Sequence, residues 1–197
     1  MLGGSGFNSL LMKELRVKRG YTYGAYSTFS FTQTSGIFTL NYSTQQDQLM
    51  DSIQVAHQTL LDFVKQPIDK KQLEEARSGM LLAFPMTYSS NANINAQLGS
   101  IGFYGLPSDY LSKYPEQLRK LTAQDVQRAI RTHIHPDHLT VIVASEKLDK
   151  EQLLKDLQNH LEPIKPVQID PQIIHPLKPS QDSDEPLHSQ TDTPASI

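Results

Sequence analysis

The 197-residue sequence contains no cysteine, so it forms no disulfide and offers no thiolate as a nucleophile or metal ligand. It also lacks any apolar run approaching the roughly 20 residues that span a bilayer. No charged and then apolar leader segment follows Met1. Basic residues are not in surplus, because 18 Lys and Arg face 21 Asp and Glu for a net charge of -3. Nothing in this balance points to nucleic acid as a partner.

The chain has room for one domain with a substantial core and for a tail. Its composition changes after Glu162, where a segment rich in Ser, Thr, Gln and Asp begins. Such a segment buries too little apolar surface to offset the entropy lost on ordering. We therefore predict a folded domain over 1–162 and a disordered tail over 163–197, which holds the prolines Pro163, Pro166, Pro171, Pro176, Pro179, Pro186 and Pro194.

The N-terminal part predicts a helix that passes directly into a strand. The spacing of Phe7, Leu10, Leu11 and Leu15 is that of one helix face, which predicts a helix over 7–19. Gly20 can adopt the left-handed conformation that ends a helix. From Tyr21 onward apolar and small polar residues alternate, which predicts a half-buried strand over 21–32.

Patterns further along the chain predict an α+β fold, with helices packed on a mainly antiparallel sheet. Strand 21–32 and the alternating run 37–44 should pair as a hairpin. Thr44 with Asp47, and Thr122 with Asp125, resemble capping boxes at helix starts. The apolar, β-branched run 139–144 suits a strand buried on both faces. Helices are predicted from Leu49 to a stop at Pro67, and over 69–84, 89–104, 107–121, 122–134 and 150–161.

Several segments resemble the C-terminal domain of the pitrilysin/insulinase zinc metallopeptidases, a family that includes mitochondrial processing peptidase. The resemblance covers about Leu2 to Ser145 and excludes the tail. It rests on Leu2-Gly3-Gly4-Ser5-Gly6-Phe7-Asn8-Ser9-Leu10-Leu11-Met12, Glu14-Leu15-Arg16, Arg19-Gly20-Tyr21-Thr22-Tyr23, Leu73-Glu74-Glu75-Ala76, Gly105-Leu106-Pro107 and His135-Pro136-Asp137-His138-Leu139-Thr140-Val141.

This resemblance implies a non-catalytic, substrate-holding domain. In the family, an Arg and a Tyr spaced as Arg16 and Tyr23 are here hold the peptide, while a separate domain supplies the zinc. It thus implies substrate-binding roles for Arg16 and Tyr23, no cofactor on this chain, and a zinc-bearing catalytic domain or subunit as partner. Leu10 departs from the family, which often has Arg there. The resemblance also implies that the first strands of the domain are missing, and we expect a bacterial periplasmic or cytoplasmic location.

The zinc motif of this family, His-x-x-Glu-His on a helix, is absent from the sequence. Two imidazoles must share one helical face, and Pro136 within His135-Pro136-Asp137-His138 would break such a helix. Together with His133, these histidines form either a metal site or a polar turn before a strand. Gly3-Gly4-Ser5-Gly6 is compatible with an anion-binding loop, although neither a preceding strand nor a following Lys-Ser/Thr supports that interpretation. Close backbone packing is the alternative.

Arg16 and Tyr23 also have structural interpretations. Tyr23 falls on the apolar face of the predicted strand, where a core tyrosine is the commoner outcome, and Arg16 lies beside the helix stripe as a surface cation. As donors, however, a guanidinium and a phenol suit the carbonyls of an extended peptide. The second functional hypothesis is a structural or assembly subunit of the same fold with no peptide-binding role.

Overall fold

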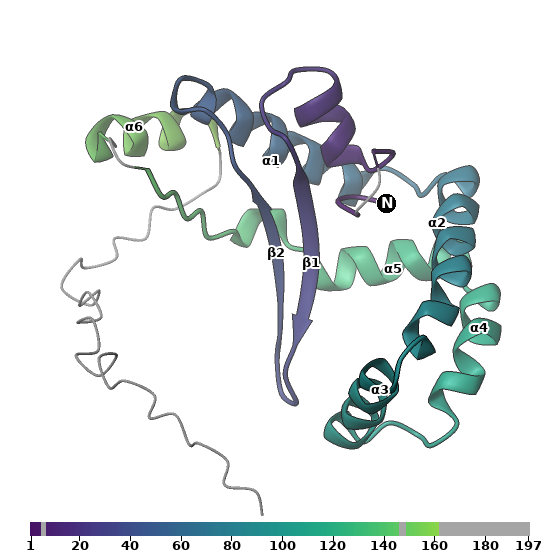
Figure 1. Cartoon of the computed structure of the whole chain (residues 1–197). Helices are drawn as coiled ribbons and strands as arrows, with labels where there is room; N and C mark the ends of the chain where they lie inside the picture. The colour runs from purple at the N-terminus through teal and green to yellow at the C-terminus, as the bar shows by residue number, and fades with distance from the viewer. Residues whose placement is uncertain (5–6, 146–148, 162–197) are drawn as a thin grey trace, which may run out of the picture. The chain divides into compact units, whose positions relative to one another are not determined.

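The computed structural model describes residues 1–4, 7–145 and 149–161, all within one compact unit (Figure 1). These residues form an α+β fold, as predicted. The predicted tail, 163–197, lies outside the described residues. The elements in order are η1 (Met12–Val17), β1 (Ala25–Phe31), β2 (Gly36–Tyr42), η2 (Gln46–Gln48), α1 (Leu49–Lys65), α2 (Lys70–Ala83), η3 (Phe84–Tyr88), α3 (Asn91–Tyr104), α4 (Tyr110–Lys120), α5 (Ala123–His133), η4 (Pro136–His138) and α6 (Lys150–His160).

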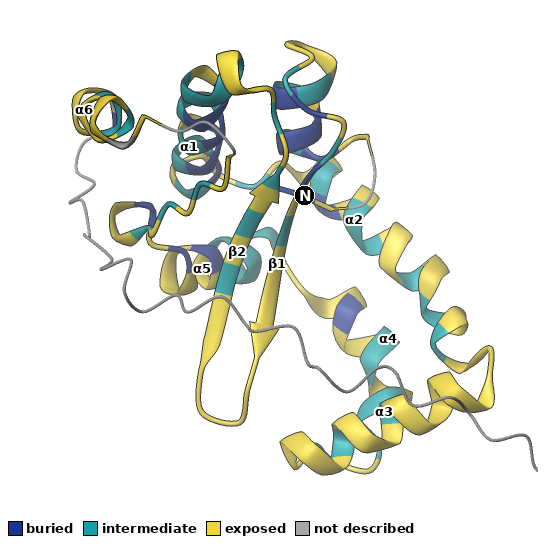
Figure 2. Ribbon diagram, turned by 60° about the vertical axis from the view of Figure 1, so that its left-hand side comes forward, coloured by how far each residue is buried: buried dark blue, intermediate teal, exposed yellow. Residues whose placement is uncertain are grey.

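Strands β1 and β2 form the predicted antiparallel hairpin, with a register running from Ala25 opposite Tyr42 to Phe31 opposite Gly36. The turn is closed by Thr32, whose backbone N–H donates to the Ser35 carbonyl at 2.8 Å. Toward this turn the hairpin is exposed on both strands, whereas its other end enters the core (Figure 2). In the described part of the chain these two strands are the whole sheet.

The core lies where η1 and α1 pack against the inner end of the hairpin. It combines the predicted stripe residues of the first helix with α1 and α5. The helix itself begins at Leu10 rather than Phe7, and over Met12–Val17 it is a π-helix, with the Lys18 N–H donating to the Lys13 carbonyl at 3.0 Å. The buried members of the core cluster are Leu2, Leu11, Leu15, Ala25, Ala56, Leu60, Phe63, Ile130 and Ile134.

The segment before η1 is tied to both neighbours by backbone hydrogen bonds. The N–H of Leu11 donates to the carbonyl of Leu2 at 2.9 Å, and the N–H of Ser27 in β1 donates to the carbonyl of Gly3 at 2.8 Å. A Cβ at Gly3 would lie 2.4 Å from the Ser27 nitrogen, closer than atoms can approach. Close backbone packing therefore explains this glycine.

Helix caps were predicted with mixed success. The Thr122–Asp125 capping box is present at the start of α5, with both reciprocal hydrogen bonds formed. The box predicted at Thr44 is wrong, because the Thr44 hydroxyl is buried without a hydrogen-bond partner and the chain enters η2 through Gln45. A capping box requires the threonine hydroxyl to accept a hydrogen bond from a backbone N–H, and spacing alone does not show whether that bond forms.

The predicted buried strand at 139–144 is also wrong. No strand is formed there, and its residues alternate between half-buried and exposed, with Ile142 84% exposed. A β-branched run favours an extended backbone, but a strand requires a neighbour to complete its hydrogen bonds. Among the described residues, no second strand lies in register with this run.

Candidate functional site

The C-terminal end of η1 places Arg16 beside the segment that leads into β1. Gly20 ends the helix with a φ of 67°, the left-handed conformation predicted for it. Its N–H donates to the Arg16 carbonyl at 2.9 Å, and the next N–H, from Tyr21, donates to the Leu15 carbonyl at 2.8 Å. These bonds fold the chain back over the last turn of the helix, so that residues after Gly20 return toward Arg16.

A side-chain turn at Thr22 then directs Tyr23 outward. The buried Thr22 hydroxyl accepts a hydrogen bond from the Gly24 N–H at 3.2 Å and lies 2.9 Å from the Gly24 carbonyl, to which it donates. The intervening residue, Tyr23, is 84% exposed. The alternative of a core tyrosine is therefore wrong. Strand β1 begins only at Ala25, so Tyr23 lies outside the stretch in which side chains alternate between the two faces of the strand.

The structure brings Arg16 and Tyr23 together through a cation–π contact. The guanidinium carbon of Arg16 lies 4.3 Å from the centroid of the Tyr23 ring and 4.6 Å from that of Phe7. Both distances are within the roughly 6 Å over which a ring quadrupole attracts a cation. We call these three residues the arginine–aromatic cluster.

Arg16 keeps its charge uncompensated within the described part of the chain, where it forms no hydrogen bond or ion pair. Its neighbours Lys18 and Arg19 are instead paired with Glu14, at 2.6 Å and 2.8 Å. The hydrogen bond from Lys18, reinforced by Arg19, holds the pKa of Glu14 below its usual value. The one carboxylate of this helix is thus paired with Lys18 and Arg19 and not with Arg16.

Sequence reasoning missed two members of this region. Phe7 was predicted on the buried stripe of a helix, yet it lies before the helix and is 60% exposed. Thr22 was placed in a strand rather than in the turn that directs Tyr23. Neither role follows from periodicity, since both depend on where the helix begins and the strand starts.

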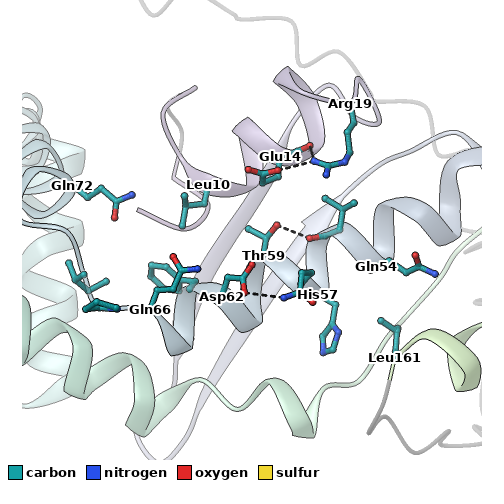
Figure 3. A pocket seen from close by; sticks show the side chains of 15 residues that line it. Leu10, Glu14, Arg19, Gln54, His57, Thr59, Asp62, Gln66, Gln72 and Leu161 are labelled. Atoms are coloured by element: carbon teal, nitrogen blue, oxygen red, sulfur yellow. Dashed lines mark hydrogen bonds and ion pairs between the residues drawn. The ribbon is translucent and has the colours of Figure 1, made fainter.

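A separate cavity of about 660 Å³ lies along α1, bordered by η1 and by Leu161 (Figure 3). The lining residue His57, the lone histidine of its helix, has a buried Nε2 atom without a hydrogen-bond partner. Burial lowers the pKa of His57, while a hydrogen bond with the backbone of Pro136 opposes that shift. Glu14 and Asp62 also line the cavity, but each carboxylate is already hydrogen-bonded to a neighbouring side chain.

No group of three His, Cys, Asp or Glu side chains able to hold a metal ion occurs among the described residues. The candidate set at His133, His135 and His138 does not converge on one point. The rings of His135 and His138 are 6.3 Å apart, across the short helix η4 that contains Pro136. The segment forms a short polar 3-10 helix at Pro136–His138, but the strand expected after it is not formed. Nor does any helix in the described part have the length and apolarity needed to cross a membrane.

The fold and the cluster thus define an α+β domain with an exposed arginine–aromatic site and, in its described part, no metal centre. The family model of the peptidase M16 inactive domain matches residues 1–80. This match confirms the resemblance to the pitrilysin/insulinase family predicted from the sequence.

Individual relatives agree with this assignment. The crystal structure of a peptidase M16 inactive domain from Pseudomonas fluorescens is 35% identical, with a TM-score of 0.64 over 69% of this chain and 32% of that chain. The inactive peptidase domain of a protein from Bordetella parapertussis described as a zinc protease is 21% identical, with a TM-score of 0.53 over 66% of this chain and 70% of that one. The latter similarity shows the fold alone.

A curated relative, the Non-peptidase homolog YmxG of Helicobacter pylori, is 24% identical over 151 residues, which are 75% of this chain and 34% of the relative. The chain therefore spans about a third of the length of this protein and of the Pseudomonas fluorescens protein.

Proposed function

We propose that this chain holds an extended peptide for a zinc-bearing domain or subunit of the same family. The observation that carries the proposal is the convergence of Arg16 and Tyr23, with the guanidinium 4.3 Å from the ring centroid. Both residues come from adjacent segments joined by one left-handed glycine, so their relative position is set by the local backbone.

The contact geometry leaves the right groups free for a peptide. A cation–π contact uses the flat face of the guanidinium, so the N–H donors along its edges remain available. The Tyr23 hydroxyl likewise has no hydrogen-bond partner among the described residues. Peptide carbonyls are acceptors, and two fixed donors match the repeated acceptors of an extended backbone.

The zinc in this proposal belongs to the partner. Two kinds of observation support that assignment: the absence of a metal-ligand group among the described residues, and the match of residues 1–80 to the inactive domain of the M16 peptidases. The chain alone should therefore hydrolyse nothing. Unstructured peptides incubated with it, with and without zinc, provide the check, and chelator-sensitive cleavage would overturn the proposal.

Reconstitution with a zinc-bearing family partner tests the roles of the two residues. Arg16→Ala and Tyr23→Phe should each cost about 1–3 kcal/mol of transition-state binding, measured as a fall of roughly 5- to 150-fold in kcat/KM. Arg131→Ala and Tyr110→Phe make matched changes outside the cluster and should leave kcat/KM unchanged. Equal activity of the Arg16 and Tyr23 variants and wild type would exclude the substrate-holding role.

The second candidate function is a structural or assembly subunit without peptide binding. The name of the Helicobacter pylori relative, a non-peptidase homologue, favours it. Fluorescence anisotropy with labelled unstructured peptides separates the two functions directly. Saturable binding that weakens in Arg16→Ala supports peptide holding, whereas assembly with a partner in the absence of any peptide binding supports the structural role.

A further inference from the structure

We infer that Phe7 is a positioning residue: with Tyr23 it clamps the guanidinium of Arg16 so that the donor edge faces outward. The inference deepens the proposed function and rests on it for the ligand, a peptide carbonyl or carboxylate oxygen. It assigns to Phe7 a role that acts through Arg16 rather than through direct contact with the ligand.

The two rings are the contacts that hold Arg16 in place. The Phe7 and Tyr23 centroids lie 4.6 Å and 4.3 Å from the guanidinium carbon. No hydrogen bond or ion pair with another described residue restrains this long, flexible side chain. An arginine side chain loses up to about 2 kcal/mol of rotamer entropy when it is fixed. If the rings already hold the side chain in the free protein, less rotamer entropy is lost when the ligand binds.

The exposure of Phe7 makes a purely structural role a poor explanation. The residue is 60% exposed and does not belong to the core cluster or to the residues packed against it. It also stacks on no other aromatic ring in the described part of the chain. Leu11 and Leu15 of the adjacent helix are completely buried and provide the core contacts there.

The backbone near Phe7 is anchored well enough to position its ring. Gly3 accepts a hydrogen bond from Ser27 of β1, and the helix begins at Leu10, whose N–H donates to the Met1 carbonyl at 3.1 Å. Phe7 lies in the turn that immediately precedes the helix. The bonds of Leu10 and Leu11 to the carbonyls of Met1 and Leu2 fix the start of the helix that follows it.

A ring in place of a carboxylate preserves the charge of Arg16 for a ligand. Lys18 and Arg19 show the alternative, because both are ion-paired with Glu14, at 2.6 Å and 2.8 Å. A carboxylate would occupy the N–H donors that a peptide oxygen needs. Aromatic faces attract the cation and leave those donors free.

The test compares Phe7→Leu, which removes the ring, with Phe7→Tyr, which keeps it. The side-chain protons of Arg16 should show ring-current shifts in the wild-type NMR spectrum. These shifts should diminish in Phe7→Leu and persist in Phe7→Tyr. Phe103→Leu changes another exposed phenylalanine, 56% exposed, and should leave the Arg16 signals unchanged. Arg16 signals that stay the same in Phe7→Leu would overturn the inference.

Peptide affinity supplies the second readout. Phe7→Leu should weaken peptide binding roughly two- to fivefold, the range expected for losing an exposed cation–π contact. It should have no further effect in an Arg16→Ala background, since Phe7 acts through Arg16. An equal loss in both backgrounds would show that Phe7 acts independently and would overturn the positioning role.

The two readouts also separate this inference from the proposed function. If Phe7→Leu changes the Arg16 signals while Arg16→Ala leaves peptide binding and kcat/KM intact, the clamp exists and the peptide-holding function fails. If Arg16→Ala abolishes binding while Phe7→Leu changes nothing, the function holds and the clamp is wrong.

Discussion

The carbonyl oxygen of Gly3 accepts a hydrogen bond from the Ser27 N–H at 2.8 Å, which fastens the N-terminal segment to the edge of β1. This contact requires the two backbones to lie so close that no side-chain atom fits between them. A Cβ at Gly3 would meet the Ser27 nitrogen at 2.4 Å and the Leu11 side chain at 2.9 Å.

Gly3→Ala should therefore destabilise the domain. Displacing the N-terminal segment or β1 to make room costs about 1–3 kcal/mol, the usual range for overpacking. Gly4→Ala is the matched control, because nothing lies within 4 Å of the position that its Cβ would take. Urea unfolding followed by circular dichroism measures both variants. Equal midpoints for the two would contradict the packing described here.

Gly20→Ala should also be destabilising, by about 1–2 kcal/mol, since its φ of 67° is unfavourable for a residue with a Cβ. Gly99 lies inside α3 with open space around it. Gly99→Ala should therefore stabilise the domain, by about 0.5–1 kcal/mol. Thermal unfolding of the two variants gives the comparison. A stabilising Gly20→Ala would mean that the helix ends in another way.

The outer edge of β2 should make the isolated chain associate with itself. The Ser27 N–H points away from β2, so the backbone N–H and C=O groups of its register partner Leu40 point away from β1. The same holds for the backbone groups of Phe38 and Tyr42, two residues to either side of Leu40. No described segment bonds to the backbone of these three residues. Neither strand contains a charged residue or a proline, the features that usually block such edges.

Adding charge to this edge should suppress the association. Thr39→Lys and Asn41→Lys place a cation on the exposed face of β2, where a second strand would have to approach. Gln124→Lys makes the same change in charge on exposed α5 and should leave the association intact. Sedimentation velocity at micromolar concentration measures all three. A monomeric wild-type chain would contradict the prediction.

Acidification should weaken the fold through His57. Burial lowers the pKa of its imidazole below the ordinary 6.5, so the folded protein favours the neutral form. This contribution to the free energy of unfolding is fully present above the pKa that the imidazole has in the unfolded chain. It is lost as the pH falls below that value and through the lower pKa of the folded state. Between about pH 7 and pH 5 the wild type should lose more stability than His57→Gln. Urea midpoints across this range are the measurement, with His138→Gln, a solvent-exposed histidine, as control.

Sequence patterns predicted those features that depend on neighbours along the chain. The stripe at Leu11 and Leu15, the glycine stop at Gly20, the hairpin and the Thr122–Asp125 box all follow from spacing within a few residues. Each is governed by local geometry, which composition and period express directly.

Features that depend on distant segments were not predictable in this way. The run 139–144 has the residues of a strand but no described partner strand, and the cavity along α1 is assembled from three separated parts of the chain. Within the site, the spacing of Arg16 and Tyr23 suggested convergence, but not that it would occur by stacking. The contribution of Phe7 depends on where the helix begins, which is the least certain part of any pattern.

The π-helical turn at Met12–Val17 sets the direction in which Arg16 points. A π-turn contains one residue more than the regular helix in the same length, bonding each N–H five residues back. Because the extra residue is absorbed within the turn, the residues on either side keep the phase they would have in a shorter regular helix. If the same residues were wound as a regular α-helix, those before the turn would be rotated by about 100° relative to Arg16. The guanidinium and the leucines of the core could then not face their present neighbours together. The π-turn is therefore what lets Arg16 and the core leucines share one helix.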